Sequence, residues 1–429
     1  MHAPVQRHNP DMSAAPTTPA ARVSALAPFR VRSFRFQWPA DLMTSWAQEM
    51  ELILLAWFIL VETKSVVMLT LFGALTYLGT LMAPVLGVTG QRIGNKKTYC
   101  GLRLAYSVTA LVTMVLALSG VLQPLHVFFL GAVLSVLRPA DLVLRYSMVG
   151  ETMPATNIIG ATSVSRTTQD SARVFGALTG AALAAWMGMA NTYIAIAGLY
   201  CCALMLSLQV TGAPGSLENR PASTLNDLGN GVVYVWQTPH LLAAMAVAFL
   251  VNLCAFPLTN GLLPIVAKEV YLSDQRGLSY LAASFAFGAL MGSLILMRIG
   301  YRLPPARAMI VFCAAWYIMT LIFAQMPGFS GGIPMLMLAG CAQSMSMVPL
   351  SAMLLRTTRT GFRGHVMGVR TLMIYGVPVG LLVAGPLIAG FGYRVTATIY
   401  CVFGLVGTAL IAWYWREHIW RIDADGNRR

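Results

Sequence analysis

The chain has 429 residues, of which 57% are hydrophobic and only 10% are charged. Soluble domains carry roughly 25% charged residues, so this composition excludes a protein whose whole surface lies in water. Apolar runs of about 20 residues, the length that a helix needs to cross a bilayer, recur along the chain. The sequence therefore predicts an all-α protein that crosses the membrane many times.

The chain begins with a segment of different composition. Residues 1–28 are rich in Pro, Ala and Thr and contain no apolar run, which is typical of a disordered cytoplasmic tail and unlike a signal peptide. After it, apolar runs alternate with polar connections. The twelve predicted transmembrane helices are 37–61, 66–87, 99–120, 122–144, 158–186, 189–209, 240–266, 278–297, 306–325, 333–355, 365–389 and 394–415.

Positive charge is distributed unevenly over the connections. The net charge is +14, and most of the 29 Lys and Arg fall in segments that lie inside the cell if the N-terminus is cytoplasmic. This is the positive-inside pattern, so the basic residues set the topology and attract anionic lipid. We therefore predict that both termini are cytoplasmic and that nucleic acid is not a partner.

The two halves of the chain resemble each other. The triplet Arg-Ile-Gly at 92–94 recurs at 298–300, an offset of 206, and the pattern of Gly176–Gly180 recurs at Gly376–Gly380, an offset of 200. Such near-equal offsets indicate duplication of a six-helix unit and two pseudo-symmetric halves. The predicted divisions are a tail (1–28), an N-terminal half (29–209), a cytoplasmic linker (210–235), a C-terminal half (236–416) and a second tail (417–429).

Two six-helix halves joined by a linker predict a solute transporter that alternates access at the interface of its repeats. The predicted spans contain no cluster of His and acidic residues that would suggest a metal, and no Ser–His pair that would suggest hydrolysis. The seven cysteines show no C-x-x-C spacing. We therefore expect no enzyme activity, no metal and no cofactor, with the proton gradient as the energy source.

Polar residues on the first helix form a candidate proton and substrate pathway. Asp41, Ser45, Gln48 and Glu49 follow offsets of zero, four, seven and eight, which makes one polar stripe. Glu51 lies about 200° away at about 100° per residue, so the two glutamates cannot face the same cavity. The stripe favours Glu49 as the proton site. Two alternatives stay open, namely that a neighbouring Arg holds Glu49, and that Glu51 faces the cavity instead.

Two further charge patterns lie on the fourth and fifth predicted helices. They consist of Arg138, Asp141 and Arg145 on one helix and of Arg166, Asp170 and Arg173 on the next. Spacings of three and four place each set on one face of its helix. One interpretation is a structural charge cluster that ties these two helices together near the cytoplasmic gate. The other is that Arg173 faces the central cavity and attracts an anionic part of the substrate.

Small residues recur on the fifth and eleventh predicted helices, at Gly176, Gly180, Gly376, Pro378 and Gly380. Glycine lets two helices approach closely in a membrane, and close packing explains most of these positions. Bending of the helices during alternating access is the second interpretation.

The connection Gly87–Lys97, GVTGQRIGNKK, follows the second predicted span. It resembles the loop at this place in the major facilitator superfamily, whose pattern is Gly, three residues, an acid, Arg, one residue, Gly, one residue and two cations. The residues that fill the pattern here are Gly87, Gln91, Arg92, Gly94, Lys96 and Lys97. Gln91 stands in the place of the acid, which in that family is thought to lock the outward-facing state. The resemblance thus implies a gating loop whose lock is weaker, or is supplied by the charges of the fourth and fifth helices.

Other segments are similar to exporters related to the enterobactin exporter. They include FRFQW at Phe34–Trp38, LRPADLVLRYSMV at 137–149 and SARVFGALTGAAL at 171–183, where Ala177 replaces the usual proline. The resemblance covers residues 29–416. It implies a transporter of the cytoplasmic (inner) membrane that exports siderophores, drugs or other amphipathic compounds.

The residues and the resemblance together predict proton-coupled efflux of a small amphipathic compound by a monomer in the lipid bilayer. Two alternatives stay open, because nothing in the residues fixes the direction of transport. One is an importer of a small anionic metabolite, and the other is a non-transporting membrane sensor or assembly protein.

Overall fold

The computed structural model describes residues 27–82, 94–154, 157–211, 225–299, 303–359, 362–418 and 420, and the secondary structure in these ranges is helical. The α-helices are α1 (Arg32–Thr63), α2 (Val66–Leu78), α4 (Asn95–Leu118), α5 (Pro124–Thr152), α6 (Ile158–Leu208), α7 (Leu225–Gln237), α8 (Pro239–Phe256), α9 (Leu263–Ile265), α10 (Gln275–Ile299), α11 (Pro305–Gln325), α12 (Phe329–Thr357), α13 (Arg363–Leu372), α14 (Gly376–Phe391) and α15 (Tyr393–Tyr414). Short 3-10 and π segments adjoin them at η1 (Ala27–Arg30), η2 (Gly79–Met82), η4 (Pro257–Gly261), η5 (Val266–Val270) and η8 (Met373–Tyr375).

The helices account for the twelve predicted spans. Within the described ranges, ten stretches are long and apolar enough to cross a membrane. One of them is α6, whose 51 residues include Gly188 with a non-helical φ of 81° and ψ of 164°. A continuous helix of that length would measure about 77 Å, far more than the ~30 Å of a bilayer, so this break separates two spans. With the shorter apolar helix α2, the count reaches twelve and the predicted fold class is confirmed.

Local signals in the sequence mark the helix ends. Ser65 precedes α2, and its hydroxyl accepts a hydrogen bond from the Met68 amide at 3.3 Å. Pro124 begins α5, where a missing amide hydrogen costs no helical hydrogen bond. Gly392 separates α14 from α15 with a φ of 80°, a conformation that residues with a Cβ rarely adopt.

Two predicted spans are less regular than the sequence suggested. The seventh consists of α8, the π segment η4, the short helix α9 and the π segment η5. Pro257 at the start of η4 lacks an amide hydrogen, which favours such a change in the helical hydrogen bonds. The eleventh is interrupted by the 3-10 segment η8 between α13 and α14. Pro378 is the third residue of α14 and has no amide hydrogen to donate to Ile374 in η8, which favours the change to 3-10 geometry there.

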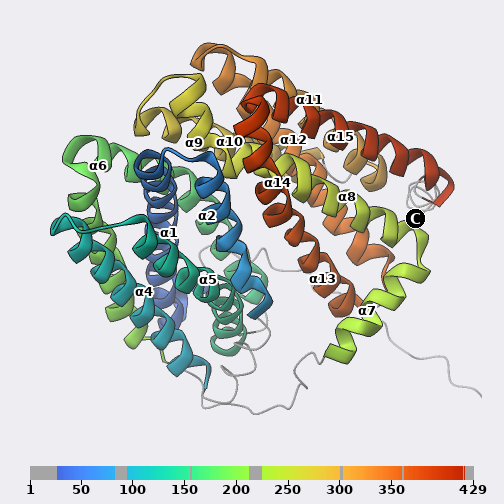
Figure 1. Cartoon of the computed structure of the whole chain (residues 1–429). Helices are drawn as coiled ribbons and strands as arrows, with labels where there is room; N and C mark the ends of the chain where they lie inside the picture. The colour runs from blue at the N-terminus through green and yellow to red at the C-terminus, as the bar shows by residue number, and fades with distance from the viewer. Residues whose placement is uncertain are drawn as a thin grey trace, which may run out of the picture.

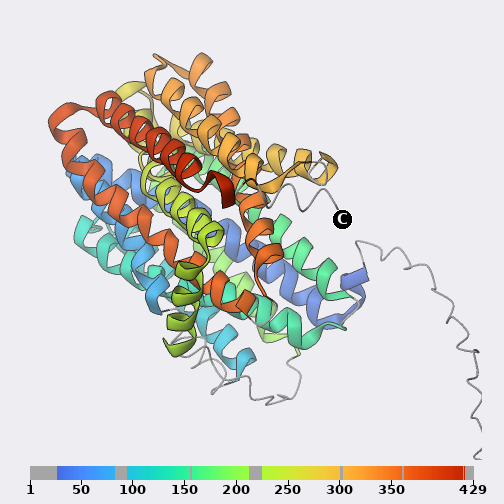
Figure 2. The ribbon, with the colours of Figure 1, turned by 90° about the vertical axis from the view of Figure 1, so that its right-hand side faces the viewer.

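The two groups of helices lie side by side, with α1 to α6 on one side and α8 to α15 on the other (Figure 1). They contact each other through α2 with α14 and through α6 with α10. Helix α7, from the predicted linker, packs against α13, and the two views of the ribbon agree on this (Figure 2).

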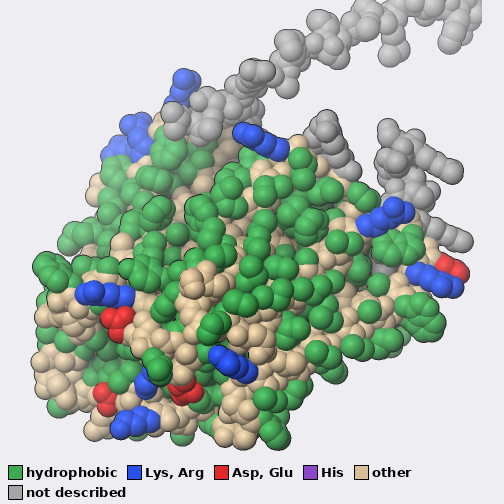
Figure 3. Space-filling model, turned by 90° about the horizontal axis from the view of Figure 1, so that it is seen from above, with side chains coloured by type: hydrophobic (Ala, Val, Ile, Leu, Met, Phe, Trp, Pro, Cys, Tyr) green, Lys and Arg blue, Asp and Glu red, His purple; other side chains and the backbone are tan. Residues whose placement is uncertain are grey.

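Hydrophobic side chains cover most of the face in Figure 3, with few charged groups among them. The limits proposed for the halves, linker and tails stay a prediction.

The glycines singled out in the sequence lie at equivalent helix contacts in the two halves. A Cβ on Gly180 of α6 would come within 2.9 Å of the Met50 Cα on α1. A Cβ on Gly376 would come within 2.7 Å of the Phe249 carbonyl oxygen on α8, and one on Gly380 would clash with the Leu253 carbonyl oxygen. These positions therefore allow backbones to approach closely, as packing glycines do in membranes.

We expect Gly380→Ala to lower the free energy of unfolding by about 1–3 kcal/mol, since overpacking forces the backbones apart. Gly390→Ala on the same helix is the matched control, because a Cβ there meets nothing within 4 Å. Thermal unfolding of the purified variants in detergent measures the difference. Equal melting temperatures for the two variants would contradict the packing role.

Part of the gating-loop pattern can be placed. Gly87, Gln91 and Arg92 lie outside the described residues, whereas Gly94 precedes α4 with a φ of 102°. A Cβ on Gly94 would meet nothing within 4 Å, so the positive φ alone explains the glycine. Lys96 and Lys97 belong to the first turn of α4.

Candidate functional site

A cavity of about 110 Å³ lies at the contact between the two halves. From the N-terminal half, α6 contributes Arg166, Asp170 and Arg173. From the C-terminal half, α10 and α12 contribute neutral residues, which are Phe285, Ala286, Ala289, Leu290, Ser293, Gln343, Ser344, Met347 and Val348. The lining thus combines one net positive charge, three polar side chains and an apolar wall, which suits an amphipathic ligand.

Close packing of small residues positions the walls of this cavity. Val174 of α6 packs against Ala283 and Ala286 of α10. A Cβ on Gly288 of α10 would clash with the Met337 carbonyl oxygen of α12, so the two helices touch backbone to backbone. The cavity lies beside these fixed contacts, which set the positions of the residues that line it.

The three charged residues of α6 differ in their partners. Nε of Arg166 lies 3.3 Å from the Asp170 carboxylate, and the two side chains are 65% and 28% exposed. Exposed pairs of this kind contribute little to stability. Arg173 is exposed in the cavity and makes no salt bridge with any described residue. Its guanidinium is therefore available to a ligand.

A second group of polar residues converges nearby from four helices. The phenol of Tyr77 on α2 lies within electrostatic reach of Glu49 on α1, Arg138 on α5 and Arg173 on α6. The Arg138 guanidinium donates a hydrogen bond to the Gln48 carbonyl oxygen at 2.6 Å. Glu49 is half-buried and faces α6, since a Cβ on Gly176 would come within 2.8 Å of the Glu49 Cβ. The side-chain amide nitrogen of Gln48 is buried without a partner among the described residues.

Asp41 and Asp141 lie elsewhere, in a buried ion cluster. The Arg103 guanidinium on α4 is 2.6 Å from the Asp41 carboxylate and 2.7 Å from that of Asp141. Nε of Arg145 donates to the Asp141 carboxylate at 2.9 Å, and the Tyr99 hydroxyl donates to that of Asp41 at 2.7 Å. The four charged side chains are at most 6% exposed. The charges of the two acids and the two arginines cancel. Their contacts tie α1, α4 and α5 together.

This cluster corrects one of the two interpretations of the charge patterns. The expected cluster between the fourth and fifth predicted helices is wrong, because Asp141 and Arg145 pair with Arg103 and Asp41. Arg166 and Asp170 instead pair within α6. Spacing along one helix fixes which side chains share a face, but it does not say which neighbouring helix that face meets. Arg103 was missed, although a lone cation inside a span already signals a buried partner.

The two glutamates of α1 have different surroundings. Glu49 lies at the contact with α6, near Arg138. Glu51 is 1% exposed in the interior of the N-terminal half. Among the described residues no group of three or more His, Cys, Asp or Glu is placed to hold a metal ion.

Comparisons with known proteins bear on the family and the fold of the chain. A family profile described as Major Facilitator Superfamily matches residues 42–381, well over half of the chain. The chain is similar to the Multidrug efflux pump Tap of Mycolicibacterium fortuitum, with 25% identity over 306 residues that cover 69% of this chain and 70% of Tap. Its fold is similar to that of the nucleoside transporter NupG, with a TM-score of 0.68 and 14% identity over 88% of this chain and 98% of NupG. It is also similar to the POT family transporter PepTSo, with a TM-score of 0.71 and 12% identity over 90% of this chain and 98% of PepTSo.

Proposed function

Because the chain belongs to the major facilitator superfamily and is a multi-pass membrane transporter, not an enzyme, we propose that it exports a small amphipathic compound. Export would occur by alternating access and be driven by inward movement of protons. The protein would lie in the cytoplasmic membrane with both termini inside, as the distribution of basic residues predicts. The similarity to a multidrug efflux pump supports the direction.

The observation that carries the substrate class is the cavity between α6, α10 and α12. Substrates of transporters built from repeats bind at the interface of the repeats, which is where this cavity lies. Arg173 offers an unpaired cation beside an apolar wall that includes Phe285 and Met347. A compound with an anionic or polar end and an apolar body would match both parts. Siderophores, drugs and other secondary metabolites include such compounds.

The direction can be tested with the anionic dye anilinonaphthalene sulfonate. Cells that contain the protein should retain less dye than cells without it, and a protonophore should abolish the difference. Greater retention would support the alternative of an importer of anionic metabolites. Equal retention for this dye and for a panel of neutral and cationic dyes would contradict dye export and favour a non-transporting protein.

The role of Arg173 can be tested with two related dyes. A hydrogen bond to a charged group contributes about 1.5–3 kcal/mol, so Arg173→Gln should slow efflux of anilinonaphthalene sulfonate about tenfold or more. N-phenyl-naphthylamine has the same skeleton without the sulfonate, and its efflux should change less than about twofold, since the lost interaction is charge-assisted. Arg394→Gln is the control, because Arg394 is exposed at the start of α15 and does not line the cavity. Equal losses for both dyes would favour a structural role for Arg173.

A further inference from the structure

The described part of the N-terminal half contains three buried acidic residues, Asp41, Asp141 and Glu51. Asp41 and Asp141 lie in the ion cluster, where Arg103 and Arg145 neutralise both. Glu51 is as deeply buried but forms no salt bridge with a described residue. Buried acids in this half are therefore of two kinds, two that are paired with arginines and one without a paired cation.

Two tyrosines of α6 lie near the Glu51 carboxyl group. Its Oε2 accepts a hydrogen bond from the Tyr200 hydroxyl at 2.9 Å, whereas its Oε1 has no partner among the described residues. Tyr193 lies within electrostatic reach of Glu51, and the Tyr106 ring stacks on Tyr200 with 5.4 Å between centroids. The hydroxyls of Tyr106 and Tyr193 are also buried without a partner among the described residues. Oε1 of Glu51 and the Tyr193 hydroxyl are therefore two unsatisfied polar groups within electrostatic reach of each other.

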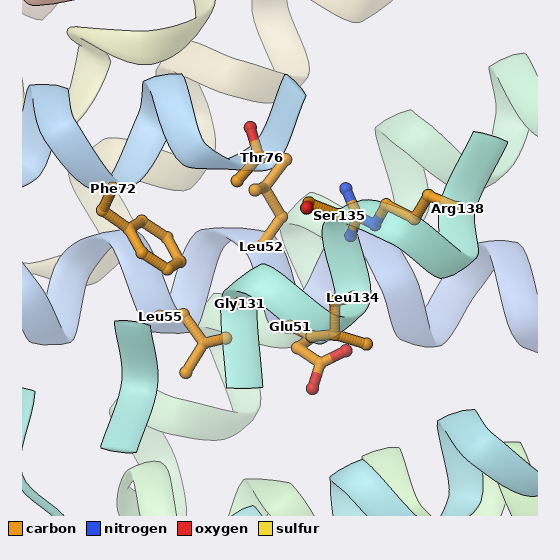
Figure 4. Close-up of a pocket in the computed structure, with 9 residues that line it drawn as sticks. All are labelled: Glu51, Leu52, Leu55, Phe72, Thr76, Gly131, Leu134, Ser135 and Arg138. Atoms are coloured by element: carbon orange, nitrogen blue, oxygen red, sulfur yellow. The ribbon is translucent and has the colours of Figure 1, made fainter. Parts of the chain in front are cut away.

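The nearest cation does not pair with Glu51. Arg138 is within electrostatic reach, but its guanidinium is bound to the Gln48 carbonyl oxygen at 2.6 Å. Figure 4 shows that the side chains of Glu51 and Arg138 point in different directions. The groups near Glu51 from α5 and α6 are thus Arg138, Tyr193 and Tyr200, and none of them neutralises it by contact.

A buried carboxylate without a paired cation is costly, and such groups become neutral instead. A proton on Oε1 removes the charge and makes that atom a donor. The partnerless Tyr193 hydroxyl is an acceptor of the right kind, either directly or through a water molecule. The surroundings of Glu51 therefore fit the protonated side chain better than the ionised one.

We propose that Glu51 is a proton-binding site in the interior of the N-terminal half, separate from the substrate cavity, and that it carries the coupled proton. The role of Glu51 in coupling rests on the proposed function, whereas the proton-binding site itself does not. The assignment moves the proton from Glu49, which the polar stripe favoured, to a carboxyl group that does not line the substrate cavity. Proton and substrate would then influence each other through the positions of the helices, without competing for one side chain.

A space large enough for a water molecule lies beside Glu51. A cavity of about 20 Å³ between α1, α2 and α5 is lined by Glu51, Thr76, Ser135 and Arg138, among others (Figure 4). This volume is enough for about one water molecule, and the lining offers polar partners for it. Arg138 connects this cavity to Gln48 and Glu49 at the contact with α6. A water molecule here would link the buried carboxyl group to the polar residues near the substrate cavity.

Infrared difference spectroscopy of the purified protein in detergent, without substrate, tests the site. The carbonyl stretching band of a protonated carboxyl group should change as the pH is varied between about 5 and 9, a range centred on neutral pH. Glu51→Gln should remove that band, and Glu49→Gln should retain it. A band that persists in Glu51→Gln, or wild-type protein without any such band, would overturn the proposal.

Tyr200→Phe provides a second arm if Glu51→Gln does not fold. It removes only the hydroxyl that donates to Oε2. A carbonyl that loses a hydrogen bond vibrates at higher frequency, so the band should move up in this variant. A band at the wild-type frequency would overturn the assignment to Glu51. Because both spectra are recorded without substrate, this result is independent of the direction of transport and of the compound transported.

Coupling is tested separately in vesicles that contain anilinonaphthalene sulfonate. Glu51→Gln should abolish dye movement driven by a pH gradient and retain exchange at equilibrium. Unchanged gradient-driven movement in this variant would remove Glu51 from the coupling. If instead the wild-type protein moves no dye in either assay while the infrared band is present, the proposed export of this dye fails and the proton site stands.

Discussion

Arg103→Met should be among the most damaging single substitutions in the N-terminal half. Arg103 is 0% exposed and contacts the carboxylates of both Asp41 and Asp141. Its removal leaves two buried acids with one arginine, and breaking a buried pair costs about 3–5 kcal/mol. This is a large part of the stability of a typical protein, so we expect little folded protein in the membrane. Fluorescence-detected gel filtration of detergent extracts measures the folded fraction.

Two further variants test whether the loss of folded protein comes from the imbalance of buried charge. Arg166→Met removes a cation from an exposed pair of the same kind and should change the folded fraction little. Arg103→Met combined with Asp141→Asn removes one charge of each sign, which leaves Asp41 and Arg145 balanced. The double variant should therefore fold better than Arg103→Met alone. If it folds worse, the cluster stabilises the protein through individual hydrogen bonds and charge balance is not what matters.

Much of the fold could be predicted because hydrocarbon restricts what a spanning segment can be. Run length, charge and the spacing of glycines located the twelve spans and the repeat, and the structure confirms the helices. The interruptions at η4, η5 and η8 were not predicted, since they depend on how neighbouring helices satisfy the freed backbone groups. The connection that contains Gly188 was predicted between two spans, but its φ of 81° is known only from the structure.

The candidate site could be predicted less well, for a geometric reason. The polar residues of α6 that the sequence singled out do line the cavity between the halves. The partners of Asp41 and Asp141 were missed, because the contacts of a buried charge come from other helices. The orientation of Glu49 and Glu51 depends on the rotation of α1 about its axis, which spacing along that helix leaves undetermined. The roles of these residues in transport stay a prediction.

The end of the molecule that carries Lys64 is the one that the charge distribution predicts to lie outside the cell, and we call it the outer end. Here Lys268 in η5 donates a hydrogen bond from Nζ to the Leu60 carbonyl oxygen at 2.9 Å. Leu60 belongs to the last turn of α1, where a cation is favoured by the helix dipole. This contact joins the C-terminal half to the N-terminal half. Alternating access requires that such contacts at the outer end break when the protein opens outward.

Lys268→Met should therefore shift the protein towards outward-open states. A hydrogen bond from a charged group is worth about 1.5–3 kcal/mol, which corresponds to roughly a tenfold to hundredfold change in the ratio of the two states. Spin labels at Ser119→Cys on the α4–α5 connection and Ser330→Cys in α12, in a background without other cysteines, report the separation of the halves at the outer end. The distance distribution should gain a longer component in Lys268→Met and not in Glu269→Gln, whose side chain is exposed next to Lys268. Lys268→Arg retains a cation and should stay near the wild-type distribution. Wild-type distances in Lys268→Met would show that other contacts, such as the close packing of Thr70 on α2 against Gly385 on α14, hold the outer end closed without this bond.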